Sequence, residues 1–456
     1  MPRNPAPAGL SATAGLVAPV TVAEIELARP ASINYVSIPE ANRGEIRHAL
    51  VLVRLHGRPR MTIVTDARAG LLDAESCAAQ AWAALRTVDS IIPGSACLAE
   101  QHPTAEASPE AALATPETGQ PGEAVPASAP PITVVVATRE RANSLSRCLN
   151  SLARLDYPDF EVVVVDNAPL TDSTAQLVQQ RPERNLRYVR EDQRGLAAAH
   201  NRGLQVAEGT IVAFTDDDVI VDRRWLTEIA SAFRADTDVA CVTGLIMAAE
   251  LQTQAQVMLE THGHFGKGFE QRVMDLAANR PADPLFPFTA GKLGSGANMS
   301  FDRDKLRTMG GFDPAIGTGT VARGGDDLAA FFTVIASGFR LVYQPTALVW
   351  HHHRRDFDSL AAQAYGYGVG LGAYLASSLC RHPASIGRAM HHAPGGLAYA
   401  FGANSPWNAT SLQSDWPRDL SRREWRGLAY GPIAYGLSRW KTRKARQLNT
   451  FQVPGQ

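Results

Sequence analysis

The sequence predicts an α/β protein whose main sheet is mostly parallel and flanked by helices. From residue 132 onward, short runs of β-branched residues alternate with stretches of helical periodicity, which is the pattern of parallel strands joined by crossover helices. Polar side chains follow the ends of several of these strands, where open α/β sheets bind ligands. A segment rich in Pro, Ala and Glu, residues 99–130, reads as a linker that separates this region from a smaller module.

The elements that precede the linker predict a small α+β module over residues 19–98, after a disordered tail over residues 1–18. Two apolar runs, 49–55 and 61–65, flank a His-Gly-Arg-Pro turn and are expected to form a hairpin, and 74–85 has helical spacing. Nothing in the module indicates chemistry. An interaction role and a stabilising appendage both remain open.

The main region, residues 131–356, is expected to begin with strands that alternate with helices. The strands are predicted at 132–137, 160–165, 186–189 and 211–214, and the helices at 143–155, 172–180 and 196–207. Residues 357–456 are predicted to form a helical C-terminal extension. Its uncharged stretch 359–380 contains four glycines and few large aliphatic residues, which argues against a membrane span.

Composition excludes several classes of protein. The 456 residues are 45% hydrophobic and 20% charged, as in globular enzymes rather than disordered chains. The 44 Lys and Arg balance 45 Asp and Glu, so no general positive field would attract nucleic acid. Five widely separated cysteines do not suggest a disulfide framework, and the N-terminus lacks the apolar run of a signal peptide. We therefore expect a cytoplasmic protein.

The strongest chemical signal is an acidic triplet, Asp216, Asp217 and Asp218, directly after the strand 211–214. Adjacent carboxylates repel one another and raise one another's pKa unless a cation is present. Oxygen ligands of this kind suit Mg²⁺ or Mn²⁺, which also bind substrate phosphates. A solvated turn or a helix cap is the alternative interpretation.

Other polar residues are expected at the same edge of the sheet. Thr138 and Arg139 follow the first strand, Asp166 and Asn167 follow the second, and Arg194 precedes the helix 196–207. Such side chains could bind the hydroxyls, amides and phosphates of a nucleotide. Ordinary turn and helix-entry residues would give the same local pattern.

Several motifs together resemble the family 2 glycosyltransferases. In order they are VVVATRERANSLSRCLNSL, VVVVDNAPLTDST, RGLAAAHNRGLQVAEG, IVAFTDDDV, GSGANMSF, GGFD, GGDDLAAFF and ALVWHHH, which cover about half of the chain. The resemblance implies a GT-A fold and an inverting enzyme that uses a nucleotide-diphosphate sugar and a divalent metal in glycan, polysaccharide or glycoconjugate biosynthesis.

The resemblance also implies roles for individual residues on the donor side. Thr138, Asp166 and Arg194 match nucleoside-contacting positions. Asp216 and Asp218 are the ends of the DxD-type motif, with Asp218 as the direct metal ligand, and Asp216 and Asp217 are also expected to contact the donor. His351, at the start of a His triplet that follows an apolar segment, matches a position that completes the metal shell in some relatives, although a solvated histidine remains the alternative.

On the acceptor side, Asp327 corresponds to the catalytic base, which would take the proton of the attacking hydroxyl. Asp326 stands where the family usually has Glu, and VDNAPLTD departs from the family's serine-containing turn. Gly296 and Asn298 lie in a segment that resembles the family's region beside the donor sugar and acceptor. A helix N-cap and a tight turn are the structural alternatives for these segments.

The C-terminal tail is basic and aromatic. Residues 418–446 hold nine basic and two acidic side chains, a net charge of 9 − 2 = +7, interleaved with Trp and Tyr. This composition suits an anionic membrane surface or a lipid-diphosphate acceptor, so the inner face of the plasma membrane is a further expected location. A solvated helical appendage is the alternative.

Two other functions are weighed against sugar transfer. A sugar-nucleotide nucleotidyltransferase would share the α/β nucleotide site, but the first strand leads into ATRERAN rather than a Gly-rich loop that cradles a triphosphate. A nucleotide-sugar or glycan-binding scaffold without turnover would not need Asp216, Asp218 and Asp327 together.

Overall fold

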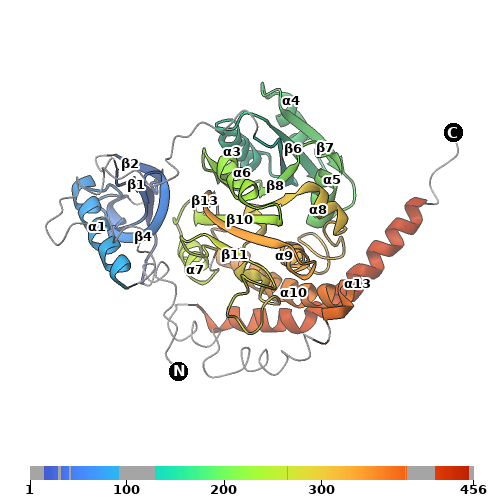
Figure 1. Cartoon of the computed structure of the whole chain (residues 1–456). Helices are drawn as coiled ribbons and strands as arrows, with labels where there is room; N and C mark the ends of the chain where they lie inside the picture. Colours follow the sequence, from blue (N-terminus) through green and yellow to red (C-terminus); the bar gives the residue numbers. More distant parts are fainter. Residues whose placement is uncertain are drawn as a thin grey trace. The chain divides into compact units, whose positions relative to one another are not determined.

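Figure 1 shows a computed structural model of the chain, coloured from the N-terminus to the C-terminus. The structure describes residues 15–28, 32–40, 43–91, 129–263, 265–385, 387 and 416–450. Most of the expected N-terminal tail, residues 1–18, and nearly all of the expected linker, residues 99–130, lie outside the described residues. The chain divides into two compact units, residues 1–126 with 248–270, and residues 127–247 with 271–456. Within the described residues, no helix combines the length and apolarity needed to cross a bilayer.

The first unit contains a four-stranded sheet in the order β2-β1-β3-β4. Its elements are β1 (Thr21–Glu26), β2 (Ile33–Ser37), a 3-10 turn at Arg43–Glu45, β3 (His48–Leu55), β4 (Arg58–Asp66) and α1 (Ala74–Ile91). The expected hairpin and helix are present, and β1 and β2 are additional. Because β1 pairs in parallel with β3, it is a non-local strand that a hairpin pattern does not reveal.

A second segment of the chain completes this unit. Residues 248–270, which the sequence alone assigns to the main region, contain α7 (Gln254–Gly263). Val20 pairs with Leu251 across an antiparallel bridge, and the backbone N–H of Ala18 donates to the Gln254 side chain at 3.1 Å. The first unit is therefore assembled from two separate parts of the sequence.

The second unit begins with the predicted alternation of strands and helices. Its first elements are β5 (Ile132–Thr138), α3 (Ala142–Leu152), β6 (Phe160–Asn167), α4 (Ser173–Gln179), β7 (Leu186–Glu191), α5 (Leu196–Val206) and β8 (Ile211–Asp216). The strands β8-β5-β6-β7 are parallel neighbours. Both faces of β5 are buried, as expected for a strand covered by helices on each side.

The rest of this sheet is antiparallel where its pairing is described, so the expected mostly parallel sheet is mixed. The later elements are β9 (Val219–Val221), α6 (Trp225–Ala235), β10 (Val239–Ala248), β11 (Arg272–Met274), β12 (Met299–Asp302), α8 (Arg303–Thr308), α9 (Asp326–Ala336) and β13 (Arg340–His351), with 3-10 turns η4 (Ala290–Lys292) and η5 (Gly296–Asn298). The order is β11-β13-β10-β12-β8-β5-β6-β7. β12 runs antiparallel to both β8 and β10, because the long connection before it lets the chain enter from the opposite end.

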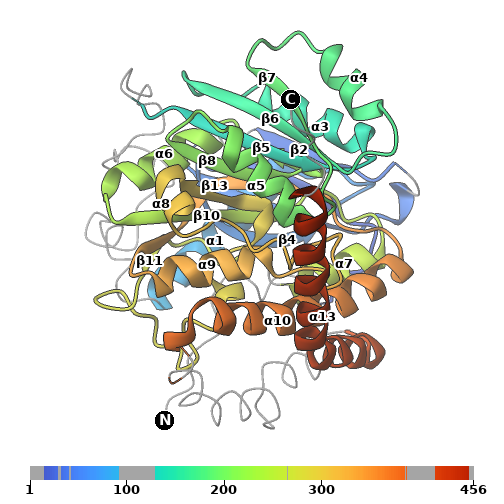
Figure 2. The same ribbon diagram turned by 90° about the vertical axis from the view of Figure 1, so that its right-hand side faces the viewer.

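Two long helices follow the sheet, α10 (Phe357–Arg381) and α13 (Arg418–Thr450), with a short 3-10 turn η6 (Pro383–Ser385). Figures 1 and 2 show the first part of α13 beside α10, and its last part leading away from α10. Glycines allow the close approach: a Cβ added at Gly368 would lie 2.0 Å from the carbonyl oxygen of Glu424, and one at Gly372 would lie 2.4 Å from that of Leu428.

Candidate active site

The acidic triplet lies where β8 ends. After Asp216 the chain turns and returns as β9, which pairs antiparallel with β13 so that Val219 lies opposite His351. This pairing brings the His351 ring to the triplet, with Nε2 3.3 Å from Oδ1 of Asp218. The pairing of the short strand β9 with the end of β13 therefore joins residues that are more than a hundred positions apart in the sequence.

Asp216, Asp218 and His351 are suited to hold a divalent cation. One ligand atom from each residue lies within 4.8 Å of the others. The Oδ1 atom of Asp218 is buried and no well-oriented hydrogen bond reaches it. Two carboxylates and one imidazole match the ligands that Mn²⁺ prefers, whereas Mg²⁺ more often binds oxygen ligands alone. The residues present therefore fit the expected divalent metal.

The electrostatics of this cluster are unequal. Burial, followed by the nearby Asp218, raises the pKa of Asp216. Burial acts in the same direction on Asp218, but His351 and Arg141 outweigh it and hold the pKa of that carboxyl well below its usual range. Burial lowers the pKa of His351, and the Asp218 carboxylate more than compensates, so that it is raised overall. Asp218 is thus kept ionised, as a metal ligand must be.

Asp217 has a different environment from its two neighbours. It is buried, and its Oδ2 accepts a hydrogen bond from Thr138 Oγ1 at 2.7 Å. Arg141 donates to Oδ1 of Asp217 and, at 2.8 Å, to Oδ2 of Asp218. Burial raises the pKa of Asp217 to about 7, against the opposing effect of Arg141. The polar groups of Thr138 and Asp217 are therefore already bonded within the protein, and their expected contacts with the donor remain predictions.

Asp166 offers a buried acceptor at the end of β6. The side chain is fully buried, and its Oδ2 accepts a hydrogen bond from the Tyr188 hydroxyl at 3.0 Å. Its Oδ1 is buried and receives no well-oriented hydrogen bond, although the Thr174 side chain is close enough to lower the pKa of the carboxyl against the stronger, raising effect of burial. A buried polar atom without a well-oriented hydrogen bond is costly, so this oxygen is a candidate to accept an N–H of a ligand.

Asn167 supports the loop that precedes α5. Its Nδ2 donates to the carbonyl of Gln193 at 2.8 Å, and its Oδ1 accepts the backbone N–H of Gly195 at 2.9 Å. Gly195 has φ +138°, a conformation that side chains rarely adopt. Asn167 therefore positions the loop that carries the exposed Arg194. The expected contact of Asn167 with the donor remains a prediction.

Arg139 is bonded within the protein at the end of β5. Its Nε donates to the carbonyl of Ala168 at 3.2 Å.

Asp327 lies at the start of α9 and is tied to the end of β8. Its Oδ1 accepts the backbone N–H of Leu328 at 2.8 Å, and its Oδ2 accepts that of Gly296 in η5 at 2.9 Å. The adjoining Ala297 carbonyl accepts a hydrogen bond from Thr215, next to Asp216, at 2.9 Å. Burial and the charge of Asp326 raise the pKa of Asp327 to about 6, which is suitable for a general base near neutral pH.

Asn298 holds η5 in place. It is buried; its Nδ2 donates to the carbonyls of Leu245 at 3.0 Å and Ala347 at 2.7 Å, and its Oδ1 accepts the indole N–H of Trp225 at 2.9 Å. These bonds connect η5 to β10, β13 and α6. Asn298 thus fixes the turn that carries Gly296, and its expected place beside the sugar remains a prediction.

Asp326 turns into the core rather than toward the end of β8. It is buried, and its Oδ2 lies 3.3 Å from Nδ1 of His200, which is also buried and packs against Phe214 and Phe312. No role for His200, Tyr188 or Arg141 is predicted from the sequence. One signal was available for His200, because it occupies the apolar stripe of α5 together with Ala197 and Leu204. Nothing in the sequence distinguishes Arg141 from Arg139.

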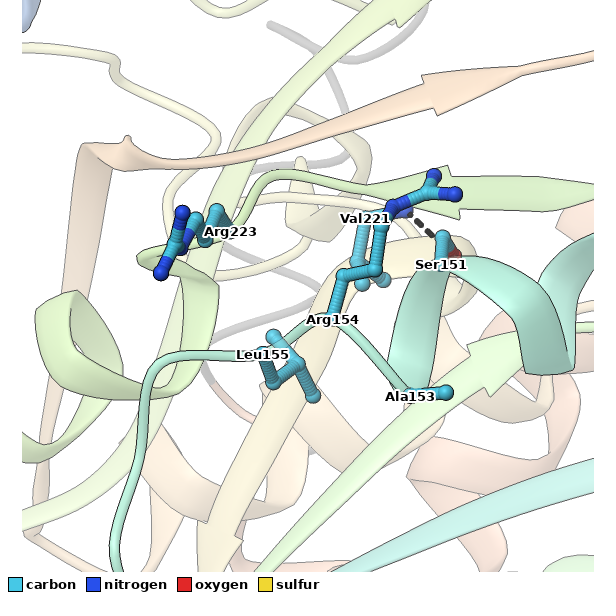
Figure 3. A pocket seen from close by; sticks show the side chains of 6 residues that line it. All are labelled: Ser151, Ala153, Arg154, Leu155, Val221 and Arg223. Atoms are coloured by element: carbon cyan, nitrogen blue, oxygen red, sulfur yellow. Dashed lines mark hydrogen bonds between the residues drawn. The ribbon is translucent and has the colours of Figure 1, made fainter. Parts of the chain in front are cut away.

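A separate hollow lies between the end of α3 and β9 and is lined by Ser151, Ala153, Arg154, Leu155, Val221 and Arg223. Figure 3 shows the side chains of Arg154 and Arg223 pointing away from one another. The Ser151 hydroxyl accepts the backbone N–H of Val221 at 3.1 Å. Because its cations do not converge and it has no acid or base among its lining residues, this hollow offers no arrangement for catalysis.

The chain is similar to known glycosyltransferases over part of its length. Residues 133–284 match the model of the family described as glycosyl transferase family 2. A pre-mycofactocin glycosyltransferase of Mycobacterium tuberculosis is 28% identical over 252 residues, which are 55% of this chain and 48% of that protein. A glucosyl-dolichyl phosphate glucuronosyltransferase of Haloferax volcanii is 22% identical over 52% of this chain and 75% of its own length.

Among solved structures, a mannosyltransferase from Pyrobaculum calidifontis in complex with GDP-Man and Mn²⁺ aligns with 68% of this chain and 88% of its own, at 21% identity and a TM-score of 0.44. The fold and the site define an α/β protein whose main sheet ends in an acidic cluster suited to a metal, and the expected α/β class with a small N-terminal module and C-terminal helices is confirmed. Residues 133–284 belong to glycosyl transferase family 2, so the chain carries a glycosyltransferase domain. The chain spans about half the length of the mycobacterial relative.

Proposed function

We propose that the protein is an inverting, metal-assisted glycosyltransferase that moves a sugar from a nucleotide-diphosphate donor to an acceptor hydroxyl. One observation carries the proposal. The metal-competent cluster at the end of β8 and the carboxylate of Asp327 are connected through η5, by the Thr215–Ala297 and Gly296–Asp327 hydrogen bonds. This short chain of contacts would hold the proposed cation site and the proposed general base at one edge of the sheet.

The donor would lie along the carboxyl ends of β5, β6 and β8. The Asp166 carboxylate, which already accepts from Tyr188, would accept a ring N–H such as that of uracil, thymine or guanine. Arg194 and Arg139, on the loops at this edge, would bind the phosphates as bidentate cations. UDP-, dTDP- and GDP-sugars are therefore the donors to test.

In the proposed reaction Asp327 takes the proton of the acceptor hydroxyl as its oxygen forms a bond to the anomeric carbon. The bond from that carbon to the nucleoside diphosphate breaks on the opposite side, so the configuration inverts. A cation bound by Asp216, Asp218 and His351 would supply charge stabilisation for the departing diphosphate. The backbone N–H groups of Leu328 and Gly296 orient the base through its two oxygens.

The acceptor is proposed only as a class. The relatives named above act, according to their names, on pre-mycofactocin and on glucosyl-dolichyl phosphate. A glycan or a lipid-linked glycoconjugate is the corresponding proposal for this chain, at the cytoplasmic side of a membrane. The site would have to admit the acceptor near Asp327 and Gly296.

The test is a thermal-shift panel of UDP-, GDP- and dTDP-sugars with and without Mn²⁺, because a ligand that binds only the folded state raises the melting temperature. We expect one nucleotide to stabilise the protein only in the presence of metal, and Asp218→Asn to abolish that shift. Asp238→Asn, an exposed carboxylate elsewhere, is the matched control. If no donor shifts the melting temperature of the wild type, with or without metal, the donor site is wrong.

Because a thermal shift measures binding and not turnover, it does not distinguish the enzyme from a binding scaffold without turnover. The two are distinguished by product: the glycosyltransferase releases nucleoside diphosphate in proportion to acceptor consumed, and Asp327→Asn stops release while donor binding persists. A nucleotidyltransferase would instead release pyrophosphate from a nucleoside triphosphate.

A further inference from the structure

The outer face of α13 carries an unusual run of exposed apolar side chains. Ile433, Leu437 and Trp440 have 60%, 46% and 60% of their surface exposed. Their spacings of four and three residues place them in one stripe along the helix. Large apolar side chains grouped in this way mark an interaction surface rather than ordinary scatter.

Exposed basic residues lie on both sides of the stripe. Arg422 and Arg426 precede it, on the other side of Pro432 within the helix, and Lys444 follows it by one turn. From residue 425 to residue 444 there are five basic residues and no acidic one. The ammonium of Lys444 lies 5.5 Å from the centre of the Trp440 ring, so the aromatic residue and the cation are presented together.

The opposite face of the helix is fixed to the second unit, which keeps the stripe outside. Ala434, Tyr435 and Ser438 are buried. The Tyr435 hydroxyl donates to Oδ2 of Asp313 at 3.2 Å. Turning the stripe inward would break this contact, so its exposure is built into the packing of α13.

We propose that this stripe and its flanking basic residues, Arg422, Arg426, Ile433, Leu437, Trp440 and Lys444, bind the surface of a bilayer that contains anionic lipids. Such a surface offers an apolar boundary for the centre of the stripe and negative headgroups for its ends. A nucleic acid would pair with the cations but leave Ile433 and Leu437 in water. A second copy of α13 would cover the apolar residues but bring like charges together.

The test uses the full-length protein and sucrose-loaded vesicles of phosphatidylcholine alone or mixed with phosphatidylglycerol. We expect sedimentation with the mixed vesicles, weakening as NaCl is raised. Replacement of Arg426 and Lys444 by Gln should lower the partition coefficient about fivefold per charge. The triple variant Ile433→Ser, Leu437→Ser and Trp440→Ser should lose at least tenfold, roughly what removal of one buried apolar side chain would give.

Matched controls are Leu71→Ser, an exposed leucine of the first unit, and Arg184→Gln, an exposed arginine before β7; neither should alter partitioning. Circular dichroism and melting temperature check that the triple variant is folded. The proposal is overturned if the wild type does not sediment with mixed vesicles, or if the folded triple variant sediments as well as the wild type. A concentration-dependent dimer that the triple variant dissociates, without vesicle binding, would assign the stripe to a second copy. None of these measurements uses sugar transfer, so the proposed function stands or falls separately.

Discussion

The carboxylate of Asp326 faces the ring of His200 in the core, with Oδ2 3.3 Å from Nδ1 and both side chains almost fully buried. Asp326 is the first residue of α9 and Asp327 is the second. This close approach, although too poorly oriented to be a hydrogen bond, places the start of the helix that carries the proposed base against α5. His200 is a positioning residue in this interpretation, since it acts through Asp326.

His200→Leu is expected to destabilise the protein by about 3 kcal/mol, because it leaves a buried carboxylate without its partner. The double variant with Asp326→Leu should recover part of this loss, which a double-mutant cycle in urea would measure. In His200→Leu, kcat should fall about tenfold or more with little change in KM, because the base is displaced. Arg202→Ala, on the surface of the same helix, is the control; additive losses in the cycle would contradict the pairing.

The raised pKa of Asp327 predicts that kcat/KM falls on the acid side of its pH profile. This pKa, raised to about 6 by burial and by Asp326, means that the carboxyl is protonated below that pH and cannot accept the acceptor's proton. We expect kcat/KM to fall tenfold per pH unit below about 6 and to level off above it. Asp326→Asn removes a charge that raises this pKa, so it should move the limb to lower pH. A limb that stays in place would show that another group titrates.

The same environment predicts a trade between activity and stability. A carboxyl whose folded pKa is raised above its unfolded value stabilises the fold in its protonated form, and that contribution is lost as pH rises through about 6. The melting temperature of Asp327→Asn should therefore fall less than that of the wild type as the pH rises through about 6, while activity drops by about a hundredfold or more. Because the amide replaces only one of the two oxygens that accept the N–H groups of Leu328 and Gly296, the variant should be less stable than the wild type at low pH. The exposed Asp304→Asn should change neither.

Arg141 is expected to hold the acidic residues together before a cation binds. Arg141→Gln removes hydrogen bonds to Asp217 and Asp218, and should lower the stability of the metal-free protein by about 2 kcal/mol. Since it also removes a positive charge beside a metal ligand, Mn²⁺ should raise the melting temperature of this variant more than that of the wild type. Arg139→Gln is the control, because Arg139 donates to a backbone carbonyl. An unchanged response to Mn²⁺ would contradict this role.

The crossing of α10 and α13 can be tested with two glycines of one helix. Gly368→Ala would place a methyl group 2.0 Å from the Glu424 carbonyl oxygen, and should destabilise the protein by about 1–3 kcal/mol through overpacking. Gly366→Ala meets nothing within 4 Å and should be neutral or stabilise by up to about 1 kcal/mol. Denaturation with urea measures both, and similar effects of the two substitutions would refute the close contact.

Local pattern was sufficient to predict the parallel half of the sheet. The strands β5, β6, β7 and β8 were all expected within two residues of their observed ends, because each is a short β-branched run between helical stretches. Local pattern does not predict the antiparallel half of the sheet, because β10 and β12 pair across about fifty intervening residues. Such pairings are decided by packing of the whole sheet.

The site shows the same division between local and distant information. Residues at strand ends could be placed at one edge from the sequence, but the partners of their side chains could not. Asn167 bonds the loop before α5 and Asn298 bonds β10, β13 and α6, which makes each a support. His200 reaches Asp326 across 126 positions, a distance over which no periodicity carries information.

The interrupted assembly of the first unit has a consequence for dissecting the gene. A truncation that starts at residue 129 would remove Val20 and Ala18 but retain Leu251 and Gln254, their partners in the later segment. The remaining polypeptide would still contain residues 248–270 but not the rest of the first unit. Leu251, which is fully buried in the whole protein, would lose its contact with Val20. Removing the first unit cleanly therefore requires two excisions, at residues 1–126 and 248–270, with a short splice between Met247 and Gln271.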